Sequence, residues 1–402
     1  MSRLFFVFLL FLLSILCICC SEKNELKNGK KVKAFLSLNT KKINTFLSSR
    51  NQARQFDEYF LDIFNQQIFS GVVLITKKGV VIYKKAYGLA NRKSRTVLTD
   101  DYVFQIGSAS KQFTSVSILM LIQQGKISLD DSIQKFFPLF PYKNIFIRTL
   151  LTHRSGLPNY MYFCDNLVYD KFKLLTNTDV VNIMCNNFPE KYYKSDKGYH
   201  YCNTNYALLA AIVEKVSGIS FEKFVHENIF NKIGMTHSFF YSELEEYKNL
   251  NIATGYLSPK YEAGFFYLNG VTGDKGIFTT VDDLYKWDLA LYSDILVKRE
   301  ILQQAFQPQT KTRRSNIYYG FGWKMYFLED STQILFHSGW WQGFQSVIMR
   351  LPKDSSSVII IKNKKTAHPV DQRMMIDILY PGNKLFGLRP VEVKESLEAI
   401  EN

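Results

Sequence analysis

Ser108-Ala109-Ser110-Lys111, at the start of a strongly helical segment, is the stretch around which the rest of the chain can be interpreted. Residues three apart on a helix are neighbours, with β-carbons about 5 to 6 Å apart, so the Lys111 amine comes within reach of the Ser108 hydroxyl. A lysine activates a serine by taking its proton, provided that burial or a nearby cation lowers the lysine pKa. We therefore predict Ser108 as a nucleophile and Lys111 as its base. Both residue types are also common on solvated helix faces, so the prediction needs support from elsewhere in the chain.

The segment after Lys111 supports a helix. Apolar residues recur between residues 112 and 124, and Gly125 stands where a helix commonly ends. Ser108 is then expected in the first turn, where unpaired N–H groups and the positive end of the helix dipole favour a developing negative charge.

The composition is that of a folded protein with a basic surface. The chain has 402 residues, 47% of them hydrophobic, which is enough for one large domain or two smaller ones. Its 50 Lys+Arg exceed its 36 Asp+Glu and give a formal net charge of +14, but the basic residues are scattered. No zinc-finger spacing or RNA-binding aromatic motif accompanies the charge, so we expect no nucleic-acid partner. An anionic envelope or lipid headgroups are a more natural neighbour.

The first residues have the features of an export signal. Arg3 precedes an apolar run over residues 4–18, and Cys19 and Cys20 end it. Residues 1–20 resemble a bacterial lipoprotein signal in which Cys20 becomes the lipid-modified first residue, although the residues just before it are not the usual small ones. A cleaved secretory signal and an uncleaved anchor are the alternatives, the run being shorter than the about 20 apolar residues of a membrane-spanning helix. We expect an exported protein of the cell envelope, attached to the membrane by this lipid, with residues 21–42 as a tether.

The remaining cysteines and histidines predict neither a disulfide scaffold nor a metal site. Cys164, Cys185 and Cys202 follow the signal, and this odd number leaves either a Cys164–Cys185 bridge or three buried thiols. The histidines show no metal-ligand spacing, so we expect no metal and no cofactor. His153, which lies in a turn, is expected to be structural and to bond the backbone of its loop.

Strand patterns stand at both ends of the chain. Runs rich in β-branched and aromatic residues, bounded by polar or glycine-containing turns, predict strands at residues 71–76, 80–83, 319–323, 334–337, 344–349 and 357–361. The pattern between them is mostly helical, and a further helix is expected over residues 43–64. We predict one antiparallel sheet built from both ends, with a helical lobe inserted over about residues 112–290, in a domain of residues 43–390 followed by a tail of residues 391–402. Two independent domains are the alternative, but a single early hairpin is too small to be stable alone.

Two further motifs carry groups that acyl transfer needs. Tyr201-Cys202-Asn203 places a phenol that can pass protons beside an amide that can orient Lys111 or a substrate carbonyl. His337-Ser338-Gly339 ends a predicted strand, where the glycine lets a substrate backbone approach closely. The Trp340 amide, just beyond, can donate to an oxyanion together with the Ser108 amide. Singly, these are ordinary loop residues and an ordinary structural histidine, but their order along the chain indicates more.

Ser-x-x-Lys, then Tyr-x-Asn, then His-x-Gly resembles the serine β-lactamase and penicillin-binding protein superfamily, specifically its class C-like branch. Three other segments are similar to motifs of that superfamily: residues 150–158 (Leu-Leu-Thr-His-Arg-Ser-Gly-Leu-Pro), residues 273–280 (Gly-Asp-Lys-Gly-Ile-Phe-Thr-Thr) and residues 319–323 (Tyr-Gly-Phe-Gly-Trp). The resemblance covers about residues 45 to 365, and chance agreement of six ordered motifs is remote.

The resemblance implies an α/β (α+β) fold, with an antiparallel sheet flanked by helices, an all-helical lobe and the active site at their junction. It also implies that Ser108 attacks a carbonyl with help from Lys111 and Tyr201, and that Asn203 positions the substrate amide. His337 takes the place that lysine holds in many β-lactamases. A histidine is largely neutral near pH 7, which weakens the expectation of antibiotic hydrolysis.

We therefore expect an exported serine hydrolase that cleaves an amide, ester or peptide bond through an acyl-enzyme. The substrate is a small molecule or peptide with a carbonyl centre, and D,D-carboxypeptidase or D-aminopeptidase, esterase and β-lactamase activities stay open because pocket loops decide among them. The protein is expected to be a monomer. The alternative is a penicillin-binding sensor or scaffold that is acylated without efficient turnover.

Overall fold

Strands from both ends of the chain pair in one sheet in the computed structural model, which describes residues 49–258, 260–313, 316–328, 330–366 and 370–382. The chain divides into two compact units, Met1–Arg54 and Gln55–Asn402. The described part of the first unit, residues 49–54, is helical. The predicted signal with Cys20, the tether and the C-terminal tail lie outside the described residues. Among the residues described, no helix combines the length and apolar character needed to cross a membrane.

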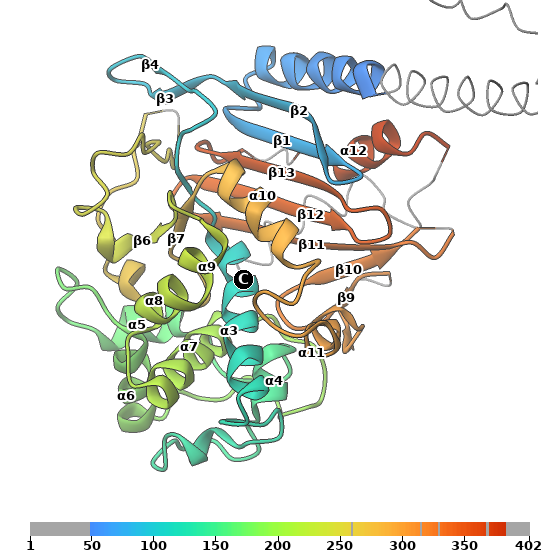
Figure 1. The fold of residues 1–402 in the computed structure, drawn as a ribbon. Helices are drawn as coiled ribbons and strands as arrows, with labels where there is room; N and C mark the ends of the chain where they lie inside the picture. Colours follow the sequence, from blue (N-terminus) through green and yellow to red (C-terminus); the bar gives the residue numbers. More distant parts are fainter. Residues whose placement is uncertain (1–48, 259, 314–315, 329, 367–369, 383–402) are drawn as a thin grey trace, which may run out of the picture. The chain divides into compact units, whose positions relative to one another are not determined.

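The second unit is built on an eight-stranded antiparallel sheet (Figure 1). Its strands, in spatial order, are β2 (Val80–Tyr87), β1 (Gly71–Lys77), β13 (Ser356–Lys362), β12 (Phe344–Leu351), β11 (Gln333–Trp341), β10 (Lys324–Phe327), β9 (Tyr318–Tyr319) and β8 (Thr310–Lys311). β1 joins the early hairpin to the late strands by pairing with β13, so that Val73 lies opposite Ile360. This pairing confirms the predicted sheet, and the alternative of two independent domains is wrong for these strands.

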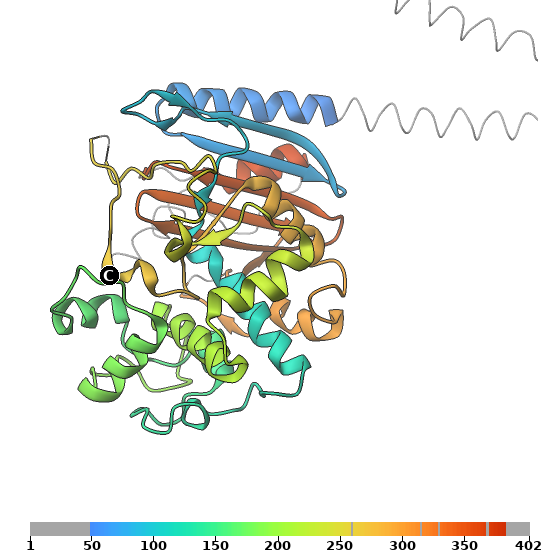
Figure 2. The same cartoon turned by 60° about the vertical axis from the view of Figure 1, so that its left-hand side comes forward.

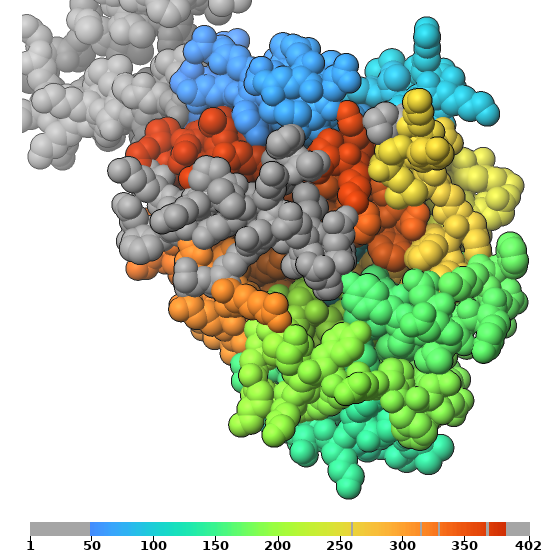
Figure 3. Space-filling view, turned by 180° about the vertical axis from the view of Figure 1, so that it is seen from behind, coloured from blue at the N-terminus to red at the C-terminus, as the bar shows by residue number. Residues whose placement is uncertain are grey.

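The middle of the chain is helical, as predicted. Its helices are α3 (Lys111–Gln123), α4 (Ile147–Leu151), α5 (Tyr160–Leu167), α6 (Asn177–Asn187), α7 (Asn203–Ser217), α8 (Phe221–Val225), α9 (Asn231–Ile233), α10 (Val281–Ala290) and α11 (Arg299–Leu302), and α12 (Gln372–Leu379) follows the last strand. Figure 1 shows α10 in front of the large sheet and α12 behind it, while α3 to α8 gather beside the sheet, an arrangement that Figure 2 also shows. Seen from behind, the green helical segments remain separate from the red late segments (Figure 3).

Two small sheets are separate from the large one. β3 (Leu89–Asn91) pairs with β4 (Thr96–Val97), and β7 (Ile277–Thr279) lies between β5 (Phe104–Gln105) and β6 (Phe239–Phe240). β5 leads directly into the segment that carries Ser108, and the Ile106 amide donates to the Ile277 carbonyl at 3.0 Å. The nucleophile segment is therefore held by backbone bonds before its helix begins.

Two details of the sequence prediction are corrected. The strand expected at residues 319–323 ends at Tyr319, because Gly322 has φ +84° and the Gly320 amide bonds back to the Trp323 carbonyl at 2.9 Å, which makes a tight turn. The Cys164–Cys185 bridge does not form: both cysteines and Cys202 are free thiols, with Cys185 only half-buried.

Candidate active site

Ser108 lies in a short 3-10 turn, Gly107–Ser110, that runs directly into α3. This turn touches the backbone of β11. Gly107 has φ +52°, and a β-carbon there would come within 2.8 Å of the Trp340 nitrogen. A β-carbon on Gly339 would lie 1.8 Å from the Ile106 carbonyl oxygen. Glycine is therefore required on both sides, and the close approach brings the Trp340 backbone next to the predicted nucleophile.

Lys111 is fully buried, and its Nζ contacts three oxygens. It lies 3.1 Å from Ser108 Oγ, 2.8 Å from Asn203 Oδ1 and 3.0 Å from the Asp274 carbonyl oxygen. Burial lowers the pKa of Lys111 to about 7; the Asp274 carboxylate acts in the opposite direction, and two nearby lysines, Lys275 and Lys324, lower the pKa further. An amine with such a pKa is in part neutral at pH 7, as a base for the Ser108 hydroxyl must be.

Tyr201 lies beside this pair as a neutral phenol. Lys111 Nζ is 4.9 Å from the centroid of the Tyr201 ring, and Ser108 lies close enough to the Tyr201 hydroxyl to act against the effect of burial on its pKa. Burial holds the pKa of Tyr201 well above its usual value. The structure thus brings Ser108, Lys111, Tyr201 and Asn203 together.

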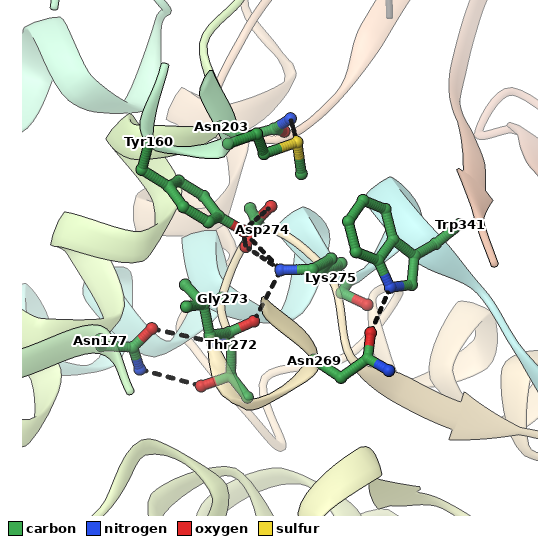
Figure 4. A network of polar contacts seen from close by, with 12 residues as sticks. Tyr160, Asn177, Asn203, Asn269, Thr272, Gly273, Asp274, Lys275 and Trp341 are labelled. Carbon is green, nitrogen blue, oxygen red and sulfur yellow. Dashed lines mark hydrogen bonds and ion pairs between the residues drawn. The ribbon is translucent and has the colours of Figure 1, made fainter. Parts of the chain in front are cut away.

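Asp274 and Lys275 form a buried network that the sequence reasoning did not connect with the site (Figure 4). The Tyr160 hydroxyl donates to both carboxylate oxygens of Asp274, at 3.2 and 3.1 Å, and Lys275 Nζ contacts the Tyr160 oxygen and one oxygen of Asp274. Asp274 is 0% exposed and Lys275 is 2% exposed. The side chain of Asp274 is therefore held by Tyr160 and Lys275 while its carbonyl accepts from Lys111. The Gly-Asp-Lys-Gly motif was the available signal, but it indicated only a turn.

His337 lies on β11, as predicted, and its ring centroid is 6.4 Å from that of Tyr201. Its side chain is 1% exposed, with Nε2 3.3 Å from the Tyr319 hydroxyl and Nδ1 2.7 Å from the Ser338 carbonyl oxygen. Burial, with Lys324 and Lys111 nearby, holds the pKa of His337 well below its usual value. Ser338 and Trp340 are half-buried, and their side chains project from the face of β11 opposite to that of His337, since successive strand residues alternate. Only the backbone of Trp340 adjoins the Ser108 turn.

Among the residues that the structure describes, no three His, Cys, Asp or Glu side chains are arranged to hold a metal ion. His153 accepts a hydrogen bond at Nδ1 from the Cys202 amide at 3.2 Å. It therefore bonds a backbone, although in the Tyr-x-Asn segment and not in its own turn.

A family model described as Beta-lactamase matches residues 49–379 of the chain. Penicillin-binding protein 4* of Bacillus subtilis (strain 168) is 30% identical over 340 residues, which cover 81% of this chain and 75% of that protein. Protein flp of Staphylococcus aureus (strain NCTC 8325 / PS 47) is 26% identical over 315 residues, or 75% of this chain and 61% of that protein. Among solved structures, the octameric penicillin-binding protein homologue from Pyrococcus abyssi is 28% identical with a TM-score of 0.68, covering 77% of this chain and 73% of that one.

Proposed function

Because the chain belongs to the beta-lactamase family, which unites serine β-lactamases and penicillin-binding proteins, we propose that it is a serine hydrolase acting through an acyl-enzyme at Ser108. The bond cleaved is an amide, ester or peptide bond. The observation that carries this proposal is the contact of 3.1 Å between Ser108 Oγ and the Nζ of a buried lysine whose pKa is about 7. The Tyr-x-Asn and His-x-Gly motifs support the class C-like branch in particular.

The first step is attack by Ser108 on the carbonyl carbon of the substrate. As the Oγ–C bond forms, neutral Lys111 takes the hydroxyl proton, and the carbonyl oxygen becomes an oxyanion. The amides of Ser108 and Trp340 donate to that oxyanion, an arrangement that the close approach of Gly107 to the Trp340 nitrogen supports.

The second step is loss of the leaving group, which needs a proton. Tyr201 is the acid that we assign to this step, because its raised pKa keeps the phenol protonated and because its hydroxyl lies near Ser108. It passes its proton to the leaving nitrogen or oxygen and recovers one from Lys111. Water then attacks the acyl-enzyme by the same route in reverse and releases the acid.

One assay separates the outcomes. The purified protein and its Ser108→Ala variant are incubated with a fluorescent penicillin, a chromogenic cephalosporin and a short-chain p-nitrophenyl ester. Turnover that disappears in Ser108→Ala supports the proposal. Stable penicillin labelling without product release favours an acylated sensor, and turnover that the substitution leaves unchanged refutes Ser108 as the nucleophile.

The location and assembly of the protein are proposals too. We propose export to the cell envelope with a lipid on Cys20; relatives named penicillin-binding proteins support the location, while the lipid rests on the sequence of residues 1–20 alone. The mass of the mature N-terminus distinguishes an acylated Cys20 from a cleaved or an intact signal. We also propose a monomer, which sedimentation of the protein without residues 1–20 tests.

A further inference from the structure

Two buried histidines and a tyrosine form a continuous chain of polar contacts beside the candidate site. His153 Nε2 lies 3.2 Å from the Tyr319 hydroxyl, and that hydroxyl lies 3.3 Å from His337 Nε2. His337 Nδ1 lies 2.7 Å from the Ser338 carbonyl oxygen. All three side chains are at most 1% exposed. The chain therefore runs through the protein interior, from the segment of Tyr201 to β11.

The first proton position follows from the partners of His153. Its Nδ1 accepts from the Cys202 amide at 3.2 Å, and the Asn205 amide group lies at the same distance. A backbone N–H can only donate, so Nδ1 carries no proton. Burial and the charges of Lys111 and Lys324 hold the pKa of His153 well below its usual value, so the ring is neutral. Its one proton is then on Nε2, which donates to Tyr319.

The other two proton positions follow in the same way. The Ser338 carbonyl can only accept, so His337 Nδ1 carries the proton of that neutral ring, and His337 Nε2 is an acceptor. The Tyr319 hydroxyl donates its proton to His337 Nε2. The Tyr206 hydroxyl gives its own proton to the Leu151 carbonyl at 2.8 Å, so towards Tyr319 it can only accept. We assign the Tyr319 proton to His337, because Tyr319 is the partner that the described residues offer to His337 Nε2. Each hydrogen bond of the chain therefore has its donor on the His153 side and its acceptor on the Ser338 side.

The end of this chain lies at an unpaired strand edge. Among the described strands, β10 pairs with β11 only from Gln333 to Phe336, whereas β12 pairs with it as far as Trp341. Gln342 and Gly343 have φ of 45° and 79°, as in a type I′ hairpin turn, so Trp341 and Phe344 exchange the closing backbone bonds. Backbone groups alternate between the edges along a strand. The N–H and C=O groups of Ser338 and Trp340 therefore point to the open edge.

We propose that His337 is a positioning residue: as a neutral, Nδ1-protonated ring it ends a one-way hydrogen-bond chain, through His153 and Tyr319, that fixes the open edge of β11 relative to the Tyr201 segment. The chain starts at the amide of Cys202, between Tyr201 and Asn203, and ends on the Ser338 peptide, two residues before the Trp340 amide. It thus sets the separation of the proton donor and the oxyanion donor. This role rests on the proposed function, and His337 then contributes no charge to a substrate.

Nitrogen-15 NMR of the full chain, labelled in its histidines, tests the proton positions. Signals are assigned by their loss in His153→Asn and His337→Asn. We expect His153 to be protonated at Nε2 and His337 at Nδ1, with neither ring gaining a second proton near pH 6.5, the usual histidine pKa. A His337 protonated at Nε2, or one that gains a second proton near that pH, overturns the proposal. This readout needs no turnover, so failure of the proposed function alone leaves it intact.

Kinetics test the positioning. Tyr319→Phe removes the bridging hydroxyl and is expected to lower kcat about 10- to 100-fold, with KM changed about twofold at most, because small displacements of reacting groups have effects of this size. Tyr318→Phe is the matched control: its hydroxyl bonds no described residue, and its activity should stay within about twofold. His337→Asn, which can still donate to Ser338, should retain more activity than His337→Ala. Equal activity of Tyr319→Phe and Tyr318→Phe refutes the positioning role.

Discussion

Replacing Lys275 by methionine should raise the pKa of Lys111 and make the enzyme need a higher pH. Lys275 is the strongest of the nearby charges that lower the pKa of Lys111, while Asp274 raises it. Removing the Lys275 ammonium deletes the first effect and leaves the Asp274 carboxylate less neutralised. Both changes favour protonated Lys111, so the pKa of Lys111 rises.

The size of the shift follows from ordinary charge effects. A close charge moves a pKa by about 1 to 3 units, and because Asp274 offsets part of the Lys275 charge we expect about 1 unit. If the pKa of Lys111 rises from about 7 to about 8, the neutral fraction at pH 7 falls from about one half to about one tenth. kcat/KM at pH 7 should then fall about fivefold, while the two proteins converge above about pH 9.

The assay is kcat/KM for an activated ester between pH 5.5 and 9.5, with Ser108→Ala as the background. Lys353→Met is the control for loss of one charge, since Lys353 is an exposed partner of Asp330. In Lys324→Met the low-pH side of the curve of kcat/KM against pH should also move to higher pH, but by less, because Lys324 has a smaller effect on the pKa of Lys111. Lys111 is refuted as the base if the low-pH side of the curve stays in place or moves to lower pH in Lys275→Met. This holds for a variant protein that still unfolds cooperatively.

Two stability predictions do not depend on the reaction. Lys362 is 3% exposed, and burial lowers its pKa to about 7 in the folded state. In the unfolded chain the same side chain is in water and stays charged up to about pH 10. Below pH 7 folding therefore buries a charged ammonium group, which costs free energy, whereas near pH 10 it does not. Lys362→Met should therefore raise the free energy of unfolding by a few kcal/mol at pH 6, and urea titrations should show the gain shrinking towards pH 10; an equal gain at both pH values contradicts this. Gly339→Ala should destabilise the protein by about 3 kcal/mol or more, because the new β-carbon would lie 1.8 Å from the Ile106 oxygen. Gly264→Ala, with nothing within 4 Å, is its control in thermal unfolding.

The spacing of residue types within a segment predicted those elements whose formation depends on that segment alone. The β-branched runs at residues 71–76 and 357–361 form β1 and β13, which lie fully or almost fully buried side by side. The spacing of Ser108 and Lys111 predicted that they would meet, and helical geometry places them 3.1 Å apart. By contrast, the strand expected at residues 319–323 failed because Gly322 packs against α3, where a β-carbon would lie 2.5 Å from Ser115 Oγ. Ser115 is about two hundred residues away in the sequence, so residues 319–323 alone could not predict this contact.

The sequence motifs pointed to Ser108, Lys111, Tyr201 and Asn203, but not to the buried Asp274–Lys275 pair beside them or to the charges of these groups. The His-x-Gly motif predicted that His337 lies near the end of a strand, and His337 is on β11. Whether its ring meets substrate depends on Tyr319, which arrives from another strand and binds Nε2. The neutral state of that ring follows from burial, which is a property of the whole fold.

The same reasoning explains why the lysines around Ser108 have to be considered together. Lys111 in contact with Asp274 alone would keep its proton, since a buried carboxylate favours the ammonium form. Lys275 prevents this by pairing with the Asp274 carboxylate, so that only the Asp274 carbonyl is left to accept from Lys111. The basic composition of the chain is therefore not only a surface property: one buried lysine neutralises the acid that would otherwise disable another. Burial is the main cause of the low pKa of Lys111, and residue 275, far from Ser108 in the sequence, limits how far the Asp274 carboxylate offsets it.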